Sequence, residues 1–250
     1  MFSHEGDARS EKQNRLLAGY LALVAGFVNS SGFVLLGTFT SHVTGNVGRL
    51  ANDAAGGAAG AAAAASAFSM VVAFFFGAFL VSVILESRWS GHVSRAYATA
   101  LVVESLLLSG FTLFSFVAEA THPRVLDAEA ALLCAAMGMQ NGLVTRLSGA
   151  VVRTTHLTGV ITDLGIESAR WFRYWRKHIS TLARVPLVMG PNAPERPSVA
   201  KARLLGAIAF AFVVGGMLGA VVTMQLGRSA LLLAAVATIA CAIHALLEDR

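Results

Sequence analysis

Charged residues are scarce in this chain: Asp, Glu, Lys and Arg make up 13% of its 250 residues, against about 25% in a soluble globular domain. A soluble domain of this size must still cover itself with polar surface, so the shortage excludes that class. Cysteine is scarce too. The two cysteines, Cys134 and Cys241, lie in apolar stretches, which indicates small buried residues rather than a disulfide or a metal pair.

The motifs of common catalytic sites are also missing. The sequence has no Walker loop, no Gly-x-Ser-x-Gly, no His-Glu-x-x-His and no paired-cysteine motif. His42 and His156 have no carboxylate or thiolate partners nearby in the sequence, so we expect no metal site. We therefore predict neither an enzyme nor a cofactor, and no nucleotide-driven transport by this chain itself.

What the chain does have is 56% hydrophobic residues, gathered in stretches close to the roughly 20 residues that span a bilayer. Backbone groups in lipid must pair within their own segment, so these stretches are predicted to be helices. The last residues of the fourth stretch include Arg146, whose long side chain can reach the membrane interface. The sequence thus predicts an all-α integral membrane protein with six transmembrane helices: Leu16–Leu36, Ala61–Leu85, Ala96–Val117, Ala130–Ala150, Leu204–Met224 and Ala230–Leu247.

The distribution of cations predicts the orientation. With the N-terminal segment 1–15 in the cytoplasm, sixteen of the nineteen Lys and Arg residues lie on the cytoplasmic side and only Arg49, Arg124 and Arg228 lie outside. Cationic loops are retained on the cytoplasmic side during insertion. We therefore expect both termini in the cytoplasm.

The segment Arg170–Lys177 mixes cations with aromatic residues. A patch that binds nucleic acid or phospholipid headgroups is one interpretation. We favour the other, in which aromatic and basic residues anchor a cytoplasmic loop at the interface, and we expect no nucleic-acid partner. Four prolines follow within Val185–Ser198, so a basic, proline-containing loop is expected at about 170–203.

A weak internal repeat is the most informative pattern. Gly26-Phe27-Val28-Asn29 corresponds to Gly138-Met139-Gln140-Asn141, and Thr40-Ser41-His42-Val43-Thr44-Gly45 corresponds to Thr154-Thr155-His156-Leu157-Thr158-Gly159. The offsets are 138 − 26 = 112 and 154 − 40 = 114 residues. The two repeats are expected to cover residues 16–117 and 130–247.

Each repeat has three spans, so the second would enter the membrane from the opposite side. Inverted repeats of this kind build many secondary transporters, whose sites lie between the repeats near the midplane. Duplication without transport is the alternative. The segments Thr38–Leu50 and Thr154–Ile166 are of mixed polarity, and a half-helix or re-entrant segment is expected there, either buried in protein or lining a cavity.

The runs Ala25–Phe33, Leu36–Asn46 and Arg153–Gly159 resemble the signature of the YoaK family of uncharacterised bacterial membrane proteins. The resemblance extends over nearly the whole chain and implies a bacterial inner-membrane protein, without supplying an activity. The chain departs from the pattern at Asn29, where we expect Asp. An ion coupled through an acid at that position is therefore not implied here.

Polar groups inside the spans are the candidate functional residues. Glu104 lies eight residues into the third span, where a charge costs roughly 2.5–3.5 kcal/mol. It is either a proton- or cation-binding group or a protonated acid that joins helices, and the neutral amides either bind a solute or join helices. The candidate substrate-binding residues are Asn29, His42, Thr44, Gly45, Asn46, Glu104, Gln140, Asn141, His156, Thr158 and Gly159.

These features favour a permease for a small solute that works by alternating access between inverted repeats, with the lipid bilayer and the solute as its partners. A membrane scaffold or assembly factor without transport is the alternative. The sequence does not identify the solute, the coupling ion or the oligomeric state.

Overall fold

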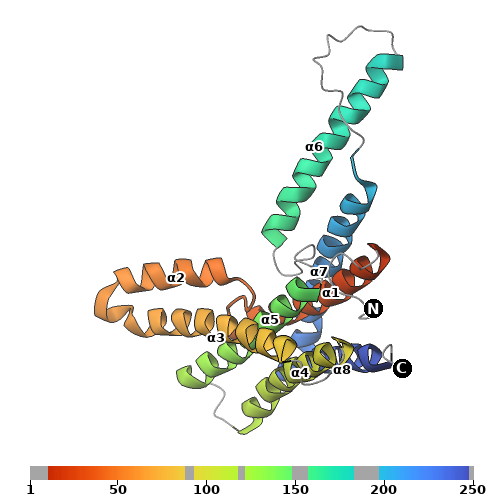
Figure 1. The fold of residues 1–250 in the computed structure, drawn as a ribbon. Helices are drawn as coiled ribbons and strands as arrows, with labels where there is room; N and C mark the ends of the chain where they lie inside the picture. Colours follow the sequence, from red (N-terminus) through yellow and green to blue (C-terminus); the bar gives the residue numbers. More distant parts are fainter. Residues whose placement is uncertain (1–10, 88–92, 118–121, 148–156, 183–196, 248–250) are drawn as a thin grey trace.

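The computed structural model describes residues 11–87, 93–117, 122–147, 157–182 and 197–247, and all regular structure within them is helical. This confirms the prediction of an all-helical chain. In Figure 1, α6 projects away from the other helices. The helices are α1 (Glu11–Leu36), α2 (Val43–Ala55), α3 (Ala61–Glu86), α4 (Val93–Val117), α5 (Pro123–Leu147), α6 (Leu157–Leu182), α7 (Val199–Leu226) and α8 (Leu231–Leu247), with short 3-10 helices η2 (Gly57–Ala59) and η3 (Gly227–Ala230).

Two glycines with positive φ end long helices. Gly37, with φ of 68°, follows the last residue of α1. Gly227, with φ of 58°, ends α7, and its N–H donates to the carbonyl oxygen of Thr223. Only glycine adopts this backbone conformation without steric cost, so the sequence sets both chain reversals.

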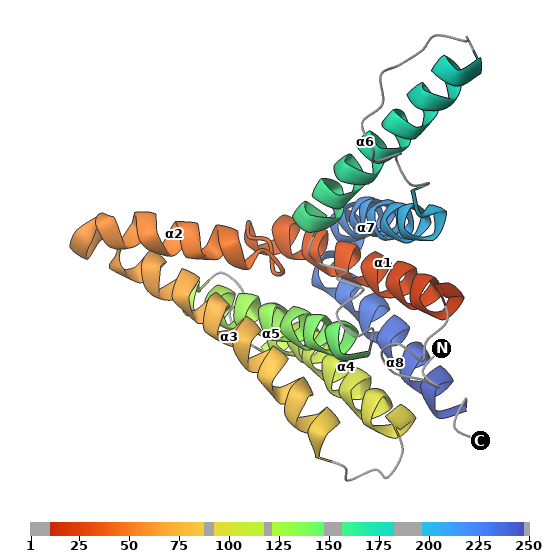
Figure 2. The same cartoon turned by 45° about the horizontal axis from the view of Figure 1, so that its top comes forward.

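Helices α1 and α7 lie side by side, as Figures 1 and 2 show, because small residues let their backbones approach. A Cβ on Gly215 would overlap the carbonyl oxygen of Leu23, and one on Gly219 would overlap that of Phe27. Both contacts advance by four residues along each helix, so α1 and α7 run in the same direction. Gly215 and Gly219, one turn apart on α7, therefore form an intramolecular packing face, as small residues do in many membrane bundles.

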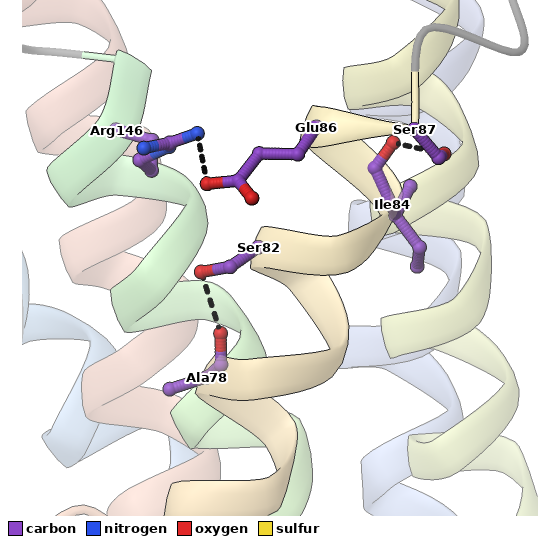
Figure 3. A network of polar contacts seen from close by, with 6 residues as sticks. All are labelled: Ala78, Ser82, Ile84, Glu86, Ser87 and Arg146. Atoms are coloured by element: carbon purple, nitrogen blue, oxygen red, sulfur yellow. Dashed lines mark hydrogen bonds and ion pairs between the residues drawn. The ribbon is translucent and has the colours of Figure 1, made fainter.

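Helices α3 and α5 form a second close pair. A Cβ on Gly77 would overlap the carbonyl oxygen of Ala135. Near the start of the pair the Ser66 hydroxyl bonds the Asp127 carboxylate. At the other end Arg146 Nη2 lies 2.8 Å from Glu86 Oε1 (Figure 3). These contacts advance together along both helices, so α3 and α5 also run in the same direction.

Helices α4 and α8 run in opposite directions. Ser105 Oγ donates to the carbonyl oxygen of Ala235 over 2.9 Å, and Thr112 Oγ1 donates to that of Arg228, at the start of η3, over 3.2 Å. As the chain advances along α4, its partner residue moves backward toward the start of α8. Hydroxyl groups that bond carbonyls of another helix are a common link between packed membrane helices.

Four stretches of the described residues are long and apolar enough to cross a membrane: Arg15–Leu36, Ala61–Glu86, Ser94–Phe114 and Val199–Leu247. The last is 49 residues long and contains two helices, α7 and α8, separated at Gly227. Helix α5 is not among the four, and it carries Gln140, Asn141 and Arg146. It packs against α1, α3 and α4, so it needs less apolar surface than a helix facing lipid. The structure therefore has the apolar helices of a multi-pass membrane protein, while a count of six spans is not established by length and composition alone.

Helices α2 and α6 lie outside the central bundle. Helix α2 runs back along α3, and α6 contacts the start of α7. The basic and aromatic segment that we expected in a loop from about residue 170 instead continues α6 to Leu182. Most of the proline segment falls in 183–196, outside the described residues. The inner face of α6 is fixed by Glu167, which is 2% exposed and pairs with Arg170 at 2.8 Å and Lys201 of α7 at 3.3 Å.

Candidate functional site

The first Gly-x-x-Asn motif fixes the chain reversal between α1 and α2. Asn29 is nearly buried on α1, and its Oδ1 accepts hydrogen bonds from Ser41 N over 3.1 Å and from Ser41 Oγ over 3.0 Å. Both bonds reach into the Thr-Ser-His segment before α2. Two otherwise separate parts of the repeated pattern are therefore in direct contact in the first half of the chain.

The first His-x-Thr-Gly motif begins a helix. His42 precedes the first residue of α2, and its carbonyl oxygen accepts from Asn46 N over 3.1 Å. A Cβ on Gly45 would overlap the His42 ring, which explains why glycine stands three residues after the histidine. Asn46 is buried, whereas Thr44 is exposed. The motif is thus packed against its own helix turn.

The second His-x-Thr-Gly motif also lies at the start of a helix. His156 lies outside the described residues, but α6 begins at Leu157, which corresponds to Val43 at the start of α2, since 157 − 43 = 114. Thr158 and Gly159 are exposed, and a Cβ on Gly159 would meet nothing within 4 Å. Each motif therefore stands at the start of a helix, but only Gly45, in the first motif, is closely packed.

The amide Gln140 joins two helices and keeps one polar atom free. Its Nε2 donates to the carbonyl oxygen of Leu21 on α1 over 3.2 Å, and the side chain is fully buried. Its Oε1 has no hydrogen-bond partner among the described residues. Asn141 beside it is also nearly buried. Gln140 therefore acts partly as a helix-joining residue, as one of the two sequence-based alternatives proposed.

Glu104 faces the interior of the bundle, as expected for an ionisable group within a span. It is fully buried on α4. Neither of its carboxyl oxygens has a hydrogen-bond partner among the described residues. It lies close enough to Tyr20 on α1 and Cys241 on α8 to interact with both electrostatically. An acid buried without a partner is unusual, because an isolated charge is very costly to bury.

Tyr20, Glu104 and Gln140 lie where the two largest hydrophobic clusters of the bundle meet, and we call these three residues the polar layer. Tyr20 packs against both clusters. Glu104 stands between Leu101 of one cluster and Leu108 of the other, and Gln140 follows Met137 and Met139, which belong to different clusters. The polar layer therefore lies at the boundary between two apolar clusters.

Tyr20 was not among the residues predicted from the sequence to bind a substrate. Its hydroxyl donates to the carbonyl oxygen of Ala237 on α8. A tyrosine five residues into an apolar span was a signal, because a buried phenol needs a hydrogen-bond partner. The cysteines predicted to be unpaired, Cys134 and Cys241, are free and buried.

The predicted site residues therefore do not form one cluster. Glu104 and Gln140 share the polar layer, Asn141 follows Gln140 on α5, and Asn29 and Asn46 lie near the turn between α1 and α2. The remaining described residues lie on the outer helices or directly before one: His42, Thr44, Gly45, Thr158 and Gly159.

A family model described as "Protein of unknown function (DUF1275)" matches residues 17–244, which is nearly all of the chain. Neither the comparison with curated proteins nor the comparison with solved structures gave a match.

Proposed function

The chain belongs to the DUF1275 family, and we propose that it is a multi-pass inner-membrane permease for a small solute, built from two three-span repeats of opposite orientation. The single observation that carries the proposal is that the close contacts of the two halves are reciprocal. By the repeat offset, α5 is the counterpart of α1, α7 is the counterpart of α3 and α8 is the counterpart of α4. Each contact between halves should then occur twice.

The first reciprocal contact is made by the glycines of the repeated motif. A Cβ on Gly26 would overlap the carbonyl oxygen of Phe212, and a Cβ on Gly138 would overlap that of Phe74. The glycines are 138 − 26 = 112 residues apart, and the phenylalanines are 212 − 74 = 138 residues apart.

The second reciprocal contact repeats both offsets. A Cβ on Gly215 would overlap the carbonyl oxygen of Leu23, and one on Gly77 would overlap that of Ala135. The differences are 135 − 23 = 112 and 215 − 77 = 138 residues. Two independent contacts with the same pair of offsets support a pseudo-two-fold relation between the halves.

The directions of the helices support a pseudo-two-fold axis that lies in the membrane plane and relates the two halves. Such an axis exchanges α4 with α8, and these helices are antiparallel. It also exchanges the pair α1 and α7 with the pair α5 and α3, and both pairs are parallel. Six helices that cross the membrane alternately have these directions, so the packing supports six spans, including α5.

The polar contacts at the helix ends agree with this alternation. In a six-span chain with a cytoplasmic N-terminus, Arg228 and Glu129 lie at the outer ends of their helices, and their side chains pair at 3.1 Å. Arg146 and Glu86 lie at the inner ends and also pair. In each ion pair, both partners fall on the same predicted side.

In this arrangement the two motifs lie on opposite sides of the membrane, with α2 outside and α6 inside. Alternating access would open the polar layer first to one side and then to the other, since the two halves are equivalent.

A scaffold without transport is the rival function. The feature that favours it is the exposed helix α6, which has Phe172, Trp175 and Arg173 at its surface.

The sidedness is tested by thiol labelling. In a chain with Cys134 and Cys241 replaced by Ala, we expect a membrane-impermeant maleimide to label Thr44→Cys only from the outside and Thr158→Cys only from the cytoplasmic side. Both residues are exposed near the start of a helix. Ser87→Cys, at the cytoplasmic end of α3, is the control for inside labelling. Labelling of Thr44→Cys and Thr158→Cys from one side would rule out the inverted repeat.

Transport is tested by ligand-induced stabilisation followed by uptake. We expect at least one compound in a panel of amino acids, sugars, nucleosides, organic acids and organic cations to raise the Tm of the purified protein, because a ligand that binds only the folded state stabilises it. That compound should then enter proteoliposomes that contain the protein. Stabilisation without uptake, or no stabilisation by any class, would favour the scaffold.

A further inference from the structure

The polar layer has an excess of hydrogen-bond acceptors. Both oxygens of Glu104 and Oε1 of Gln140 are buried without a partner among the described residues. Among the side-chain donors of the layer, the Tyr20 hydroxyl bonds the Ala237 carbonyl and one N–H of Gln140 Nε2 bonds the Leu21 carbonyl, and none bonds Glu104. A buried acceptor without a donor costs about 1–3 kcal/mol, so the layer favours a ligand that supplies a hydrogen-bond donor.

The three side chains are held at one level by a single turn of α1. Gln140 bonds the backbone of Leu21, and Tyr20, the preceding residue, interacts electrostatically with Glu104. The layer thus connects α1 and α5, the first helices of the two halves, to α4. No Lys or Arg within the described part of the chain forms an ion pair with Glu104.

We infer that Glu104 binds an exchangeable proton, and that this proton is the ion coupled to solute movement. The inference rests on the proposed transport function for its role, but not for its existence. A proton converts the carboxylate into a neutral carboxyl with one O–H donor. Gln140 Oε1 is the buried acceptor of the layer that has no donor among the described residues.

A second buried acid in the same bundle provides the comparison. Glu129 is as fully buried as Glu104, but it receives two bonds of 3.1 Å from Arg228, from Nε to Oε1 and from Nη2 to Oε2. In such a pair the guanidinium balances the charge of the carboxylate. Of these two acids, only Glu104 needs a mobile positive charge.

Other titratable groups face the layer from two of the helices packed around it. Tyr20 lies on α1 and Cys241 on α8, and His244 one turn further along α8 is exposed. Neither a phenol nor a thiol supplies a carboxyl group, so an infrared measurement of carboxyl groups separates Glu104 from both.

The test is difference infrared spectroscopy of the purified full-length protein in lipid. We expect a C=O stretching band of a protonated carboxyl that shifts in deuterated water, disappears in Glu104→Gln and persists in Glu129→Gln. The wild type should lose this band reversibly as the pH is raised, so a variant that fails to fold does not prevent the test. Tyr20→Phe should keep the band, because a phenol contributes no carboxyl group.

Several results would overturn the inference. They are a band that persists in Glu104→Gln, the absence of a protonated-carboxyl band at any pH at which the protein is folded, and loss of the band at constant pH when sodium replaces choline, which would assign a metal cation to the layer. A proton site present in a protein that moves no solute would overturn the transport function and leave the proton site intact.

Discussion

Gly215→Leu is expected to abolish folding of the bundle, and Gly215→Ala to lower its free energy of unfolding by about 1–3 kcal/mol, the usual cost of overpacking a tight contact. The added Cβ would overlap the backbone carbonyl of Leu23, and backbone within two packed helices has little freedom to move. Thermal denaturation in detergent, followed by loss of the monodisperse peak in size-exclusion chromatography, measures the effect.

The same helix offers a matched control. Gly206 also lies on α7, but a Cβ there would meet nothing within 4 Å, so Gly206→Ala should leave the Tm unchanged or raise it slightly. Gly77→Ala should be as harmful as Gly215→Ala, because it makes the equivalent contact in the other half. A harmless Gly77→Ala beside a harmful Gly215→Ala would contradict the equivalence of the two halves.

Arg228→Ala is expected to destabilise the protein by about 3–5 kcal/mol, the cost of breaking a buried ion pair from one side. Glu129 is fully buried, and two of the hydrogen bonds to its carboxylate come from Arg228. Removal of the guanidinium leaves a charge inside the bundle without that partner. The free energy of unfolding, measured by chemical denaturation in mixed micelles, is the appropriate readout.

The control is an ion pair with the same chemistry but more exposure. The side chains of Arg146 and Glu86 are 48% and 64% exposed (Figure 3), so Arg146→Ala should cost only about 0–1 kcal/mol. In the double variant Arg228→Met with Glu129→Leu most of the stability should return, because no charge is left unpaired. Equal losses for Arg228→Ala and Arg146→Ala would mean that Glu129 is not buried in the membrane-embedded protein.

The sequence predicted the apolar helices well because length and lack of charge are direct consequences of the bilayer. The first two predicted spans, Leu16–Leu36 and Ala61–Leu85, lie within α1 and α3. Each predicted span ends within one residue of the end of its helix. The fifth predicted span, Leu204–Met224, stops two residues before Gly227 breaks α7. Glycine and apolar length together carry this information.

The helices outside the bundle were less predictable. The sequence predicted a half-helix or re-entrant segment over Thr154–Ile166 and a basic loop from about residue 170, whereas α6 continues for 26 residues through Arg170, Trp171 and Arg173. Helix α6 packs on one side against α7, so its residues are of mixed polarity, like those of a loop. The spacing of its apolar residues does not reveal that α7 is the helix against which they pack. Glu167, which holds the buried side of α6 to Lys201, gave no signal in the sequence.

The polar layer was half predictable. Glu104 and Gln140 stood out as polar residues in apolar spans, and both are buried. Their placement at one level, with Tyr20, depends on how α1, α4 and α5 pack against one another, and a single sequence does not contain the relative heights of separate helices. The sequence shows the proposed repeat only at its motifs, because the glycine contacts of α3 and α7 require no matching residues around them.

The reciprocal glycine contacts bear on how such a chain arises. A protein of half this length, with only the first three spans, would carry both surfaces of the contact, the glycine of its first helix and the carbonyl facing it on its second. Two copies inserted in opposite directions could therefore assemble as an antiparallel dimer, using Gly26 against Phe74 and Gly77 against Leu23. Fusion of two such genes would fix one copy in each direction and free the outer helices to diverge, which is where Gly45 and Gly159 now differ in packing.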